Sequence, residues 1–166
     1  MGFIQKDALR TMIITYLGLL LGYLNKGILF VLILSTEEIG LINLIVSVGL
    51  LFAQLSNLGA INAITKFLPF FRDNSEQKQS FLQLNIIFVF AGILLFTSII
   101  LLLRGQIVNY YSEKSALFVD YYYWIIPIGI ANVFFLVFET YLRSLFKNIL
   151  SVFLYEFLLR VIVTIL

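Results

Sequence analysis

A single lysine, Lys26, lies inside a long apolar stretch that runs from residue 11 to residue 35. An ammonium group within a membrane-spanning segment usually marks a substrate pathway or a bound counter-charge. The stem of Lys26 can also carry its charge to the membrane surface, because Ser35 is only about 13 Å further along a helix. Lys26 therefore predicts either a cation that faces an anionic cargo or a snorkelling lysine, and the sequence leaves both open.

Small and polar residues recur every three or four positions along this first stretch, so they share one face of a helix. The Gly18-x-x-x-Gly22 pattern is typical of membrane helices that approach one another closely. Asn25 adjoins Lys26 and suits a water-filled cavity instead. Close packing and a cavity wall are both open for this face, which consists of Thr11, Thr15, Gly18, Gly22 and Asn25.

The second apolar stretch repeats the pattern and is richer in amides than any other predicted span. Two adjacent helices with polar faces can line one cavity, and hydrogen bonds between helices are the alternative, at about 0.6 kcal/mol per contact. The candidate cavity residues in this stretch are Asn43, Ser47, Gln54 and Asn57, with Gly40 on the same face.

Two further patterns lie in the C-terminal half of the chain: acidic and basic residues four positions apart, and a proline close to a glycine. Glu139 precedes Arg143 by four residues and Glu156 precedes Arg160 by four, which is the favoured order for an ion pair on a helix. Arg160 either is neutralised by Glu156 or faces the cavity while Glu156 holds it in place. Pro127 removes a backbone hydrogen bond within the fourth apolar stretch, so Pro127 and Gly129 predict a kink or hinge.

Composition places this chain in a membrane. Of its 166 residues, 61% are hydrophobic and 12% are charged, against about 25% charged residues in soluble domains. The apolar segments approach the roughly 20 residues of a spanning helix, which excludes a barrel of short strands. The chain has no cysteine or histidine, and its net charge of +2 is too small to indicate nucleic acid. We find no catalytic or metal-binding motif, and we expect no enzyme activity and no cofactor.

The sequence predicts an all-α, polytopic bundle of five spans. Basic residues cluster in alternate loops, and the positive-inside rule therefore places the N-terminus in the cytoplasm. The last apolar run stops at Leu166 with no flanking anchor, so we expect the natural protein to continue. The predicted spans are residues 11–35, 39–66, 82–103, 121–141 and 149–166, and the seven basic residues on the cytoplasmic side are Lys6, Arg10, Lys66, Arg72, Lys78, Arg143 and Lys147, against Arg104 and Lys114 outside.

The chain resembles the N-terminal portion of polysaccharide flippases in the multidrug, oligosaccharidyl-lipid and polysaccharide exporter superfamily. One similar run is IGLINLIVSVGLLFAQLSNLGAINAITKFLPFF, with Gly40 after the acidic turn and an ending formed by Leu58, Gly59, Ala60, Lys66 and Phe67. The other is TYLRSLFKNILSVFLYEFLLRVIV, a basic turn between the fourth and fifth helices. The likeness is one of pattern over all 166 residues.

This resemblance implies a transporter of the bacterial inner membrane that flips lipid-linked oligosaccharides by alternating access, with this chain as part of its first lobe. It implies that Lys26, and less directly Arg160, meet the polyprenyl pyrophosphate of the substrate. Membrane lipids and proteins of polysaccharide assembly are the expected partners. The alternatives are a drug or cation exporter of the same superfamily, a membrane glycosyltransferase or polymerase fragment, and a helical scaffold that transports nothing.

Overall fold

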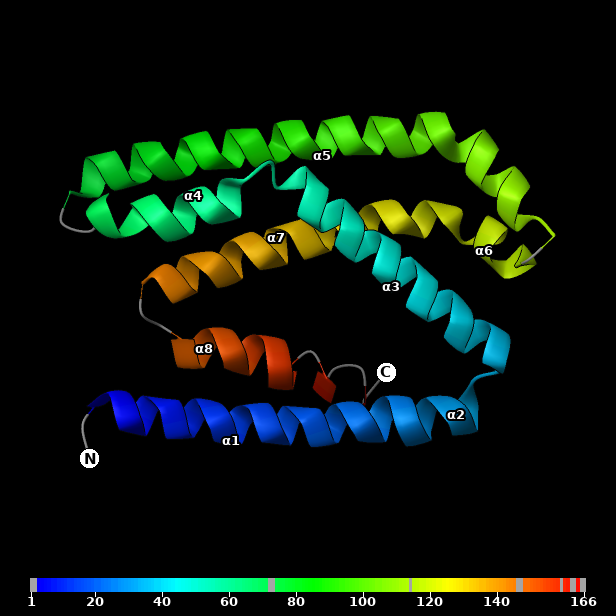
Figure 1. Cartoon of the computed structure of the whole chain (residues 1–166), viewed down its shortest axis with the longest axis horizontal. Coiled ribbons are helices and arrows are strands. Elements are labelled where there is room, and N and C mark those ends of the chain that lie inside the picture. Colours follow the sequence, from blue (N-terminus) through cyan, green and yellow to red (C-terminus); the bar gives the residue numbers. More distant parts are fainter. Residues whose placement is uncertain are drawn as a thin grey trace. The chain divides into compact units, whose positions relative to one another are not determined.

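The computed structural model describes residues 3–71, 74–113, 115–145, 148–158, 160–161 and 164, and the described residues are helical where they form regular structure (Figure 1). The chain divides into two compact units, one made of residues 1–36 and 145–166 and the other of residues 37–144. Four helical stretches are long and apolar enough to cross a membrane: Ala8–Ile33, Thr36–Ser56, Ser75–Tyr111 and Tyr122–Ser144. These four stretches support a multi-pass membrane protein of the helical class.

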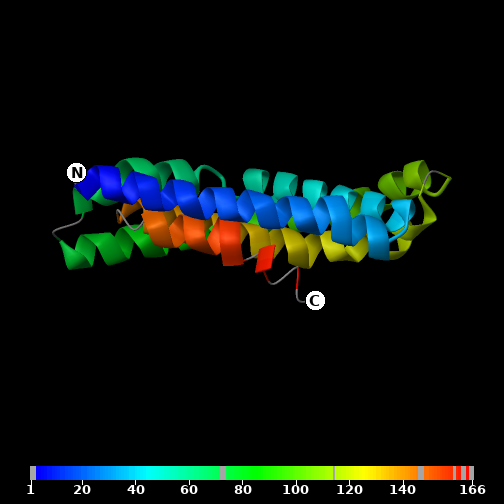
Figure 2. The ribbon, with the colours of Figure 1, turned by 90° about the horizontal axis from the view of Figure 1, so that it is seen from below.

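The first unit pairs the two ends of the chain. Helix α1 (Phe3–Tyr23) continues through a π-helical segment, η1 (Leu24–Leu29), into the short α2 (Phe30–Ile33). Helix α8 (Asn148–Val152) and a second π-helical segment, η4 (Phe153–Leu158), pack along α1, as Figure 2 shows. The predicted fifth span is thus represented by a shorter apolar helix, Ile149–Leu158, and several residues beyond it lie outside the described part of the chain.

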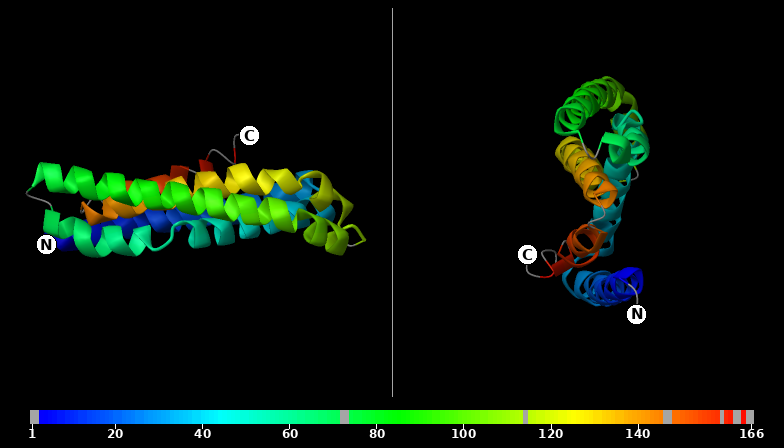
Figure 3. Two further views of the ribbon diagram at one scale, coloured as in Figure 1. Left: turned by 90° about the horizontal axis from the view of Figure 1, so that it is seen from above. Right: turned by 90° about the vertical axis from the view of Figure 1, so that its left-hand side faces the viewer.

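The second unit is built on α5 (Ser75–Tyr111), which is much longer than the predicted span of residues 82–103. The Asn74 side chain caps its start by accepting a hydrogen bond from the Gln77 amide at 3.1 Å. Helices α4 (Ala60–Phe67) and α7 (Ile125–Ser144) pack against α5 and against each other (Figure 3). The remaining elements of this unit are α3 (Thr36–Ser56), η2 (Leu68–Phe71), α6 (Ala116–Asp120) and η3 (Tyr122–Trp124).

The helix predicted over residues 39–66 is not continuous, which corrects the sequence-based expectation. Helix α3 ends at Ser56, and α4 begins at Ala60 after a break at Leu58 and Gly59. Both of these residues have positive φ, 45° at Leu58 and 84° at Gly59. Gly59 adopts this left-handed conformation without a steric penalty, so the chain can change direction there. The break ends α3 after 21 residues, a length that suits the hydrocarbon core.

Two apolar clusters hold the second unit together. One is formed by buried side chains of α3, α4, α5 and α7, including Phe52, Ala60, Val89 and Val133. The other surrounds Tyr122, which is 1% exposed and donates a hydrogen bond from its hydroxyl to the Ile100 carbonyl at 2.7 Å. Because most other large apolar side chains of the candidate spans are exposed, their outer surfaces suit a lipid environment.

Candidate functional site

Lys26 and Asn25 both lie in the π-helical segment η1, which the sequence did not predict. A π-turn widens the helix locally, and such turns are frequent at functional sites. Asn25 is 3% exposed, whereas its neighbour Lys26 has an exposed side chain. The two adjacent polar residues of this segment therefore have different surroundings.

Asn25 uses both ends of its amide to join the N-terminal and C-terminal segments of the first unit. Its Nδ2 donates to the Arg160 carbonyl at 2.9 Å, and its Oδ1 accepts a hydrogen bond from the Thr164 hydroxyl at 2.9 Å. In this conformation Asn25 is an interhelical hydrogen-bonding residue rather than part of an open cavity wall. The structure thus favours the packing interpretation for Asn25.

The two glycines of the same face also pack closely. A Cβ added at Gly18 would collide with the backbone oxygen of Glu156, and one added at Gly22 would lie 3.0 Å from Arg160 Nη1. The backbone contact at Gly18 requires glycine, whereas at Gly22 the flexible Arg160 side chain would have to shift by a few tenths of an ångström; both approaches fit the small residues on this face. The ion pair expected between Glu156 and Arg160 is confirmed, with 2.7 Å between Oε2 and Nη2.

Lys26 has no ion-pair partner among the described residues. It follows Gly22, which the Arg160 guanidinium approaches, by four residues, and it is exposed. Arg160 and Glu156, which pack against Gly22 and Gly18 of the same helix, are paired with each other and not with Lys26. Whether Lys26 meets a cargo anion or reaches the membrane surface stays a prediction.

A polar stripe runs along the exposed face of α3, and we define it as Asn43, Ser47 and Gln54, which are all exposed. At about 100° per residue these positions fall within a narrow arc that also contains Gly40. The buried residues of α3 lie on the opposite side of the helix: Ile45, Gly49, Phe52, Ala53 and Ser56. The stripe therefore faces away from the core of its own unit.

Asn57, the fourth candidate of the second stretch, does not share this exposed face. It is 7% exposed, and its Nδ2 donates to the Gln54 carbonyl at 2.5 Å while its Oδ1 accepts from the Gly59 amide at 2.9 Å. The side chain thus bridges the end of α3 and the break before α4. Its observed role is to stabilise that break.

The predicted hinge residues occupy the start of an unbroken helix. Pro127 lies in the first turn of α7, where a missing backbone amide is tolerated, and α7 continues to Ser144. Gly129 is buried, and a Cβ there would collide with the ring of Phe52 on α3. Gly129 therefore permits the close crossing of α3 and α7, and motion at this point stays a prediction.

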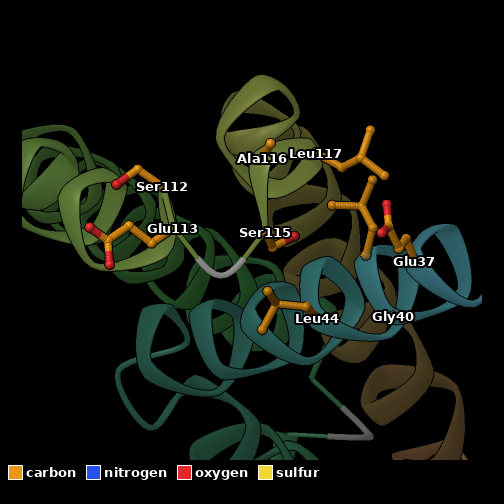
Figure 4. Close-up of a pocket in the computed structure, with 9 residues that line it drawn as sticks. Glu37, Gly40, Leu44, Ser112, Glu113, Ser115, Ala116 and Leu117 are labelled. Atoms are coloured by element: carbon orange, nitrogen blue, oxygen red, sulfur yellow. The ribbon is translucent and has the colours of Figure 1, made fainter.

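An open hollow of about 460 Å³ lies between the start of α3 and the connection from α5 to α6, and no sequence pattern predicts it. Figure 4 shows that α3 presents Glu37 while the connection presents Glu113 and Ser115. The lining residues of the hollow come from two segments, 37–44 and 112–117, that are far apart in the sequence and share no pattern that predicts their proximity. Within the described residues, no group of three or more histidine, cysteine or acidic side chains is arranged to hold a metal ion.

Comparisons with known proteins return nothing for this sequence: no family model, no curated protein and no solved structure matches it. The assignment to multi-pass helical membrane proteins therefore depends on the four candidate spans. The site candidates within those spans are the cation-bearing π-helical segment of the first unit and the polar stripe of the second.

Proposed function

We propose that this protein is a transporter of the bacterial inner membrane that moves lipid-linked oligosaccharide units across the bilayer by alternating access. The observation that carries the proposal is the exposed polar stripe of α3, Asn43, Ser47 and Gln54, on the face opposite the core of its unit. Amide and hydroxyl groups are costly in contact with lipid unless they meet water or a polar partner. A hydrated pathway for a sugar-bearing cargo supplies such contacts.

Lys26 supplies the second part of the proposal. An ammonium without a carboxylate partner among the described residues is available to a phosphate oxygen, and such charge-assisted contacts are shorter and stronger than neutral ones. In this role Lys26 binds the pyrophosphate that links the glycan to its polyprenyl carrier. Arg160 is the weaker candidate because Glu156 already neutralises it.

A drug or cation exporter is less well supported by the same residues. Such an exporter needs a carboxylate in the membrane that can exchange a proton or sodium ion. Glu156 is held by Arg160 at 2.7 Å, and breaking a partly buried pair leaves an uncompensated charge. Glu156 is therefore poorly suited to release and rebind a coupling ion.

Export of surface glycan in the native host tests the proposal. Cells that lack the protein receive the wild type, Lys26→Ala, Lys26→Arg or the control Lys66→Ala, which removes an exposed lysine outside the four candidate spans. We expect Lys26→Ala to lose surface glycan and accumulate lipid-linked precursor, while Lys26→Arg and Lys66→Ala export it. Equal membrane levels on immunoblots exclude a failure of insertion. Normal export by Lys26→Ala would refute the phosphate role, and dye extrusion without glycan export would replace the proposal with a drug exporter.

A further inference from the structure

An amphipathic groove lies between the first turns of α5 and the last turns of α7, within the second unit. It consists of two hollows of about 440 and 130 Å³ that share Leu82, Ile86 and Tyr141 as lining residues. The larger hollow lies toward the start of α5, and the smaller one reaches Ile64 of α4. The shared lining residues make the two hollows neighbouring parts of one groove.

The larger hollow is polar on one side and carries a positive charge. Lys78, Gln79 and Gln83 line it. The Lys78 ammonium lies 5.7 Å from the centre of the Tyr141 ring, a cation–π distance that holds the charge at the groove. Among the described residues no carboxylate forms an ion pair with Lys78. This end of the groove is therefore suited to an anion.

The smaller hollow is apolar. Val137 and Phe138 of α7 face Leu82 and Ile86 of α5 across it. Asn85 also lines it, but its Nδ2 already donates to the Phe81 carbonyl at 2.8 Å, so the amide group is partly satisfied within its own helix. A hydrocarbon chain is the kind of ligand that this lining accommodates.

The two ends follow the change of polarity along α5. Lys78 and Gln79 precede the apolar run that begins at Phe81, and Ile86 lies within that run. From Lys78 to Ile86 the helix rises about 12 Å. That distance joins the headgroup layer to the outer part of the hydrocarbon core. The groove thus has the polarity and orientation of one lipid molecule.

We propose that this groove binds an anionic glycerophospholipid of the surrounding bilayer. Its phosphate lies at Lys78 and the two glutamine amides, and one acyl chain lies along Leu82, Ile86 and Phe138. Basic pockets between membrane helices bind anionic headgroups through the same chemistry. The inference depends on the membrane location of the helices and not on the transported cargo, so it can hold even if the proposed function fails.

Tryptophan quenching by brominated lipids tests the proposal. The chain has one tryptophan, Trp124, so Trp124→Phe combined with Phe138→Trp places the only indole in the groove. We expect brominated phosphatidylglycerol to quench it several-fold more than brominated phosphatidylcholine at equal mole fraction. Lys78→Gln removes this preference and Lys78→Arg keeps it. The control Lys66→Gln, a lysine that also lies over a ring but outside the groove, leaves the preference intact.

Equal quenching by the two lipids, or a preference that survives Lys78→Gln, would overturn the proposal. Displacement of the brominated phosphatidylglycerol by a much smaller fraction of undecaprenyl phosphate would also overturn it, because the groove would then belong to a carrier lipid. If the reporter variant does not fold, native mass spectrometry of the wild type and Lys78→Gln measures retained phosphatidylglycerol instead. Retention that is equal in the two proteins contradicts the site.

Discussion

Gly92 of α5 lies directly against the end of α3. A Cβ added at this position would collide with the backbone oxygen of Ser56 and would lie 3.0 Å from Leu58 Cγ. A backbone carbonyl cannot rotate away as a flexible side chain can, so Gly92→Ala must push the two helices apart. Gly105 provides a matched control on the same helix, because a Cβ there would meet no atom within 4 Å.

The comparison isolates the packing contribution to the free energy of unfolding. Replacing glycine by alanine within a helix stabilises it by up to about 1 kcal/mol, and this contribution is common to both variants. Overpacking costs about 1–3 kcal/mol, and a rigid backbone partner places Gly92→Ala toward the upper end. We expect Gly92→Ala to be less stable than Gly105→Ala by about 2–3 kcal/mol.

Unfolding in mixed micelles with an increasing mole fraction of sodium dodecyl sulfate, followed by circular dichroism, measures this difference. Gly105→Ala should unfold at the same or a higher dodecyl sulfate fraction than the wild type, and Gly92→Ala at a lower one. If the two variants unfold together, α5 and the end of α3 are not in the close contact described, and the packing of the second unit is wrong.

The same unfolding assay tests two further positions. Asn25→Ala removes the hydrogen bonds to Arg160 and Thr164. It should lower the free energy of unfolding by about 1–2 kcal/mol, because each bond contributes about 0.6 kcal/mol on average and packing is lost as well. Unchanged stability would show that Asn25 is not buried as described. Gly59→Ala should lower the free energy of unfolding by about 1–2 kcal/mol because φ is 84° at this position. Gly59→Asn should lower it less, since asparagine tolerates this conformation. Equal losses of stability in the two variants would contradict a purely conformational cause.

The helical class was predictable because it follows from composition and segment length alone. The apolar excess and the runs near 20 residues allow few other structures in lipid. Local ion pairs were also predictable, because the Glu139–Arg143 and Glu156–Arg160 pairs require only that the two residues lie four apart on a helix.

Helix ends were harder to predict because hydropathy does not detect them. The α3–α4 break lies inside an apolar stretch, and only Asn57 and Gly59, an asparagine and a glycine that tolerate left-handed conformation, signalled it. Helix α5 begins seven residues before the predicted span because polar residues such as Glu76 and Gln77 are good helix formers outside the hydrocarbon.

The surroundings of the polar residues could not be predicted, since they depend on partners distant in sequence. Asn25 and Ser47 are both polar residues inside apolar helical stretches. Asn25 is buried because the segment at Arg160 and Thr164 packs on it, whereas Ser47 lies opposite the face of α3 that the core covers. The π-helical segment η1 likewise is not encoded by any simple periodicity of its residues.

Water accessibility of the polar stripe of α3 tests the transport proposal most directly. These 166 residues contain no cysteine, so single cysteines at Asn43, Ser47 and Gln54 can be labelled in intact membranes with a membrane-impermeant thiol reagent. Leu55→Cys is the control, because Leu55 is 53% exposed on a different side of the same helix. A hydrated pathway predicts rapid labelling at all three stripe positions, protection by the lipid-linked oligosaccharide and little labelling at position 55. Labelling of the stripe as slow as that of Leu55→Cys would contradict a hydrated pathway along α3.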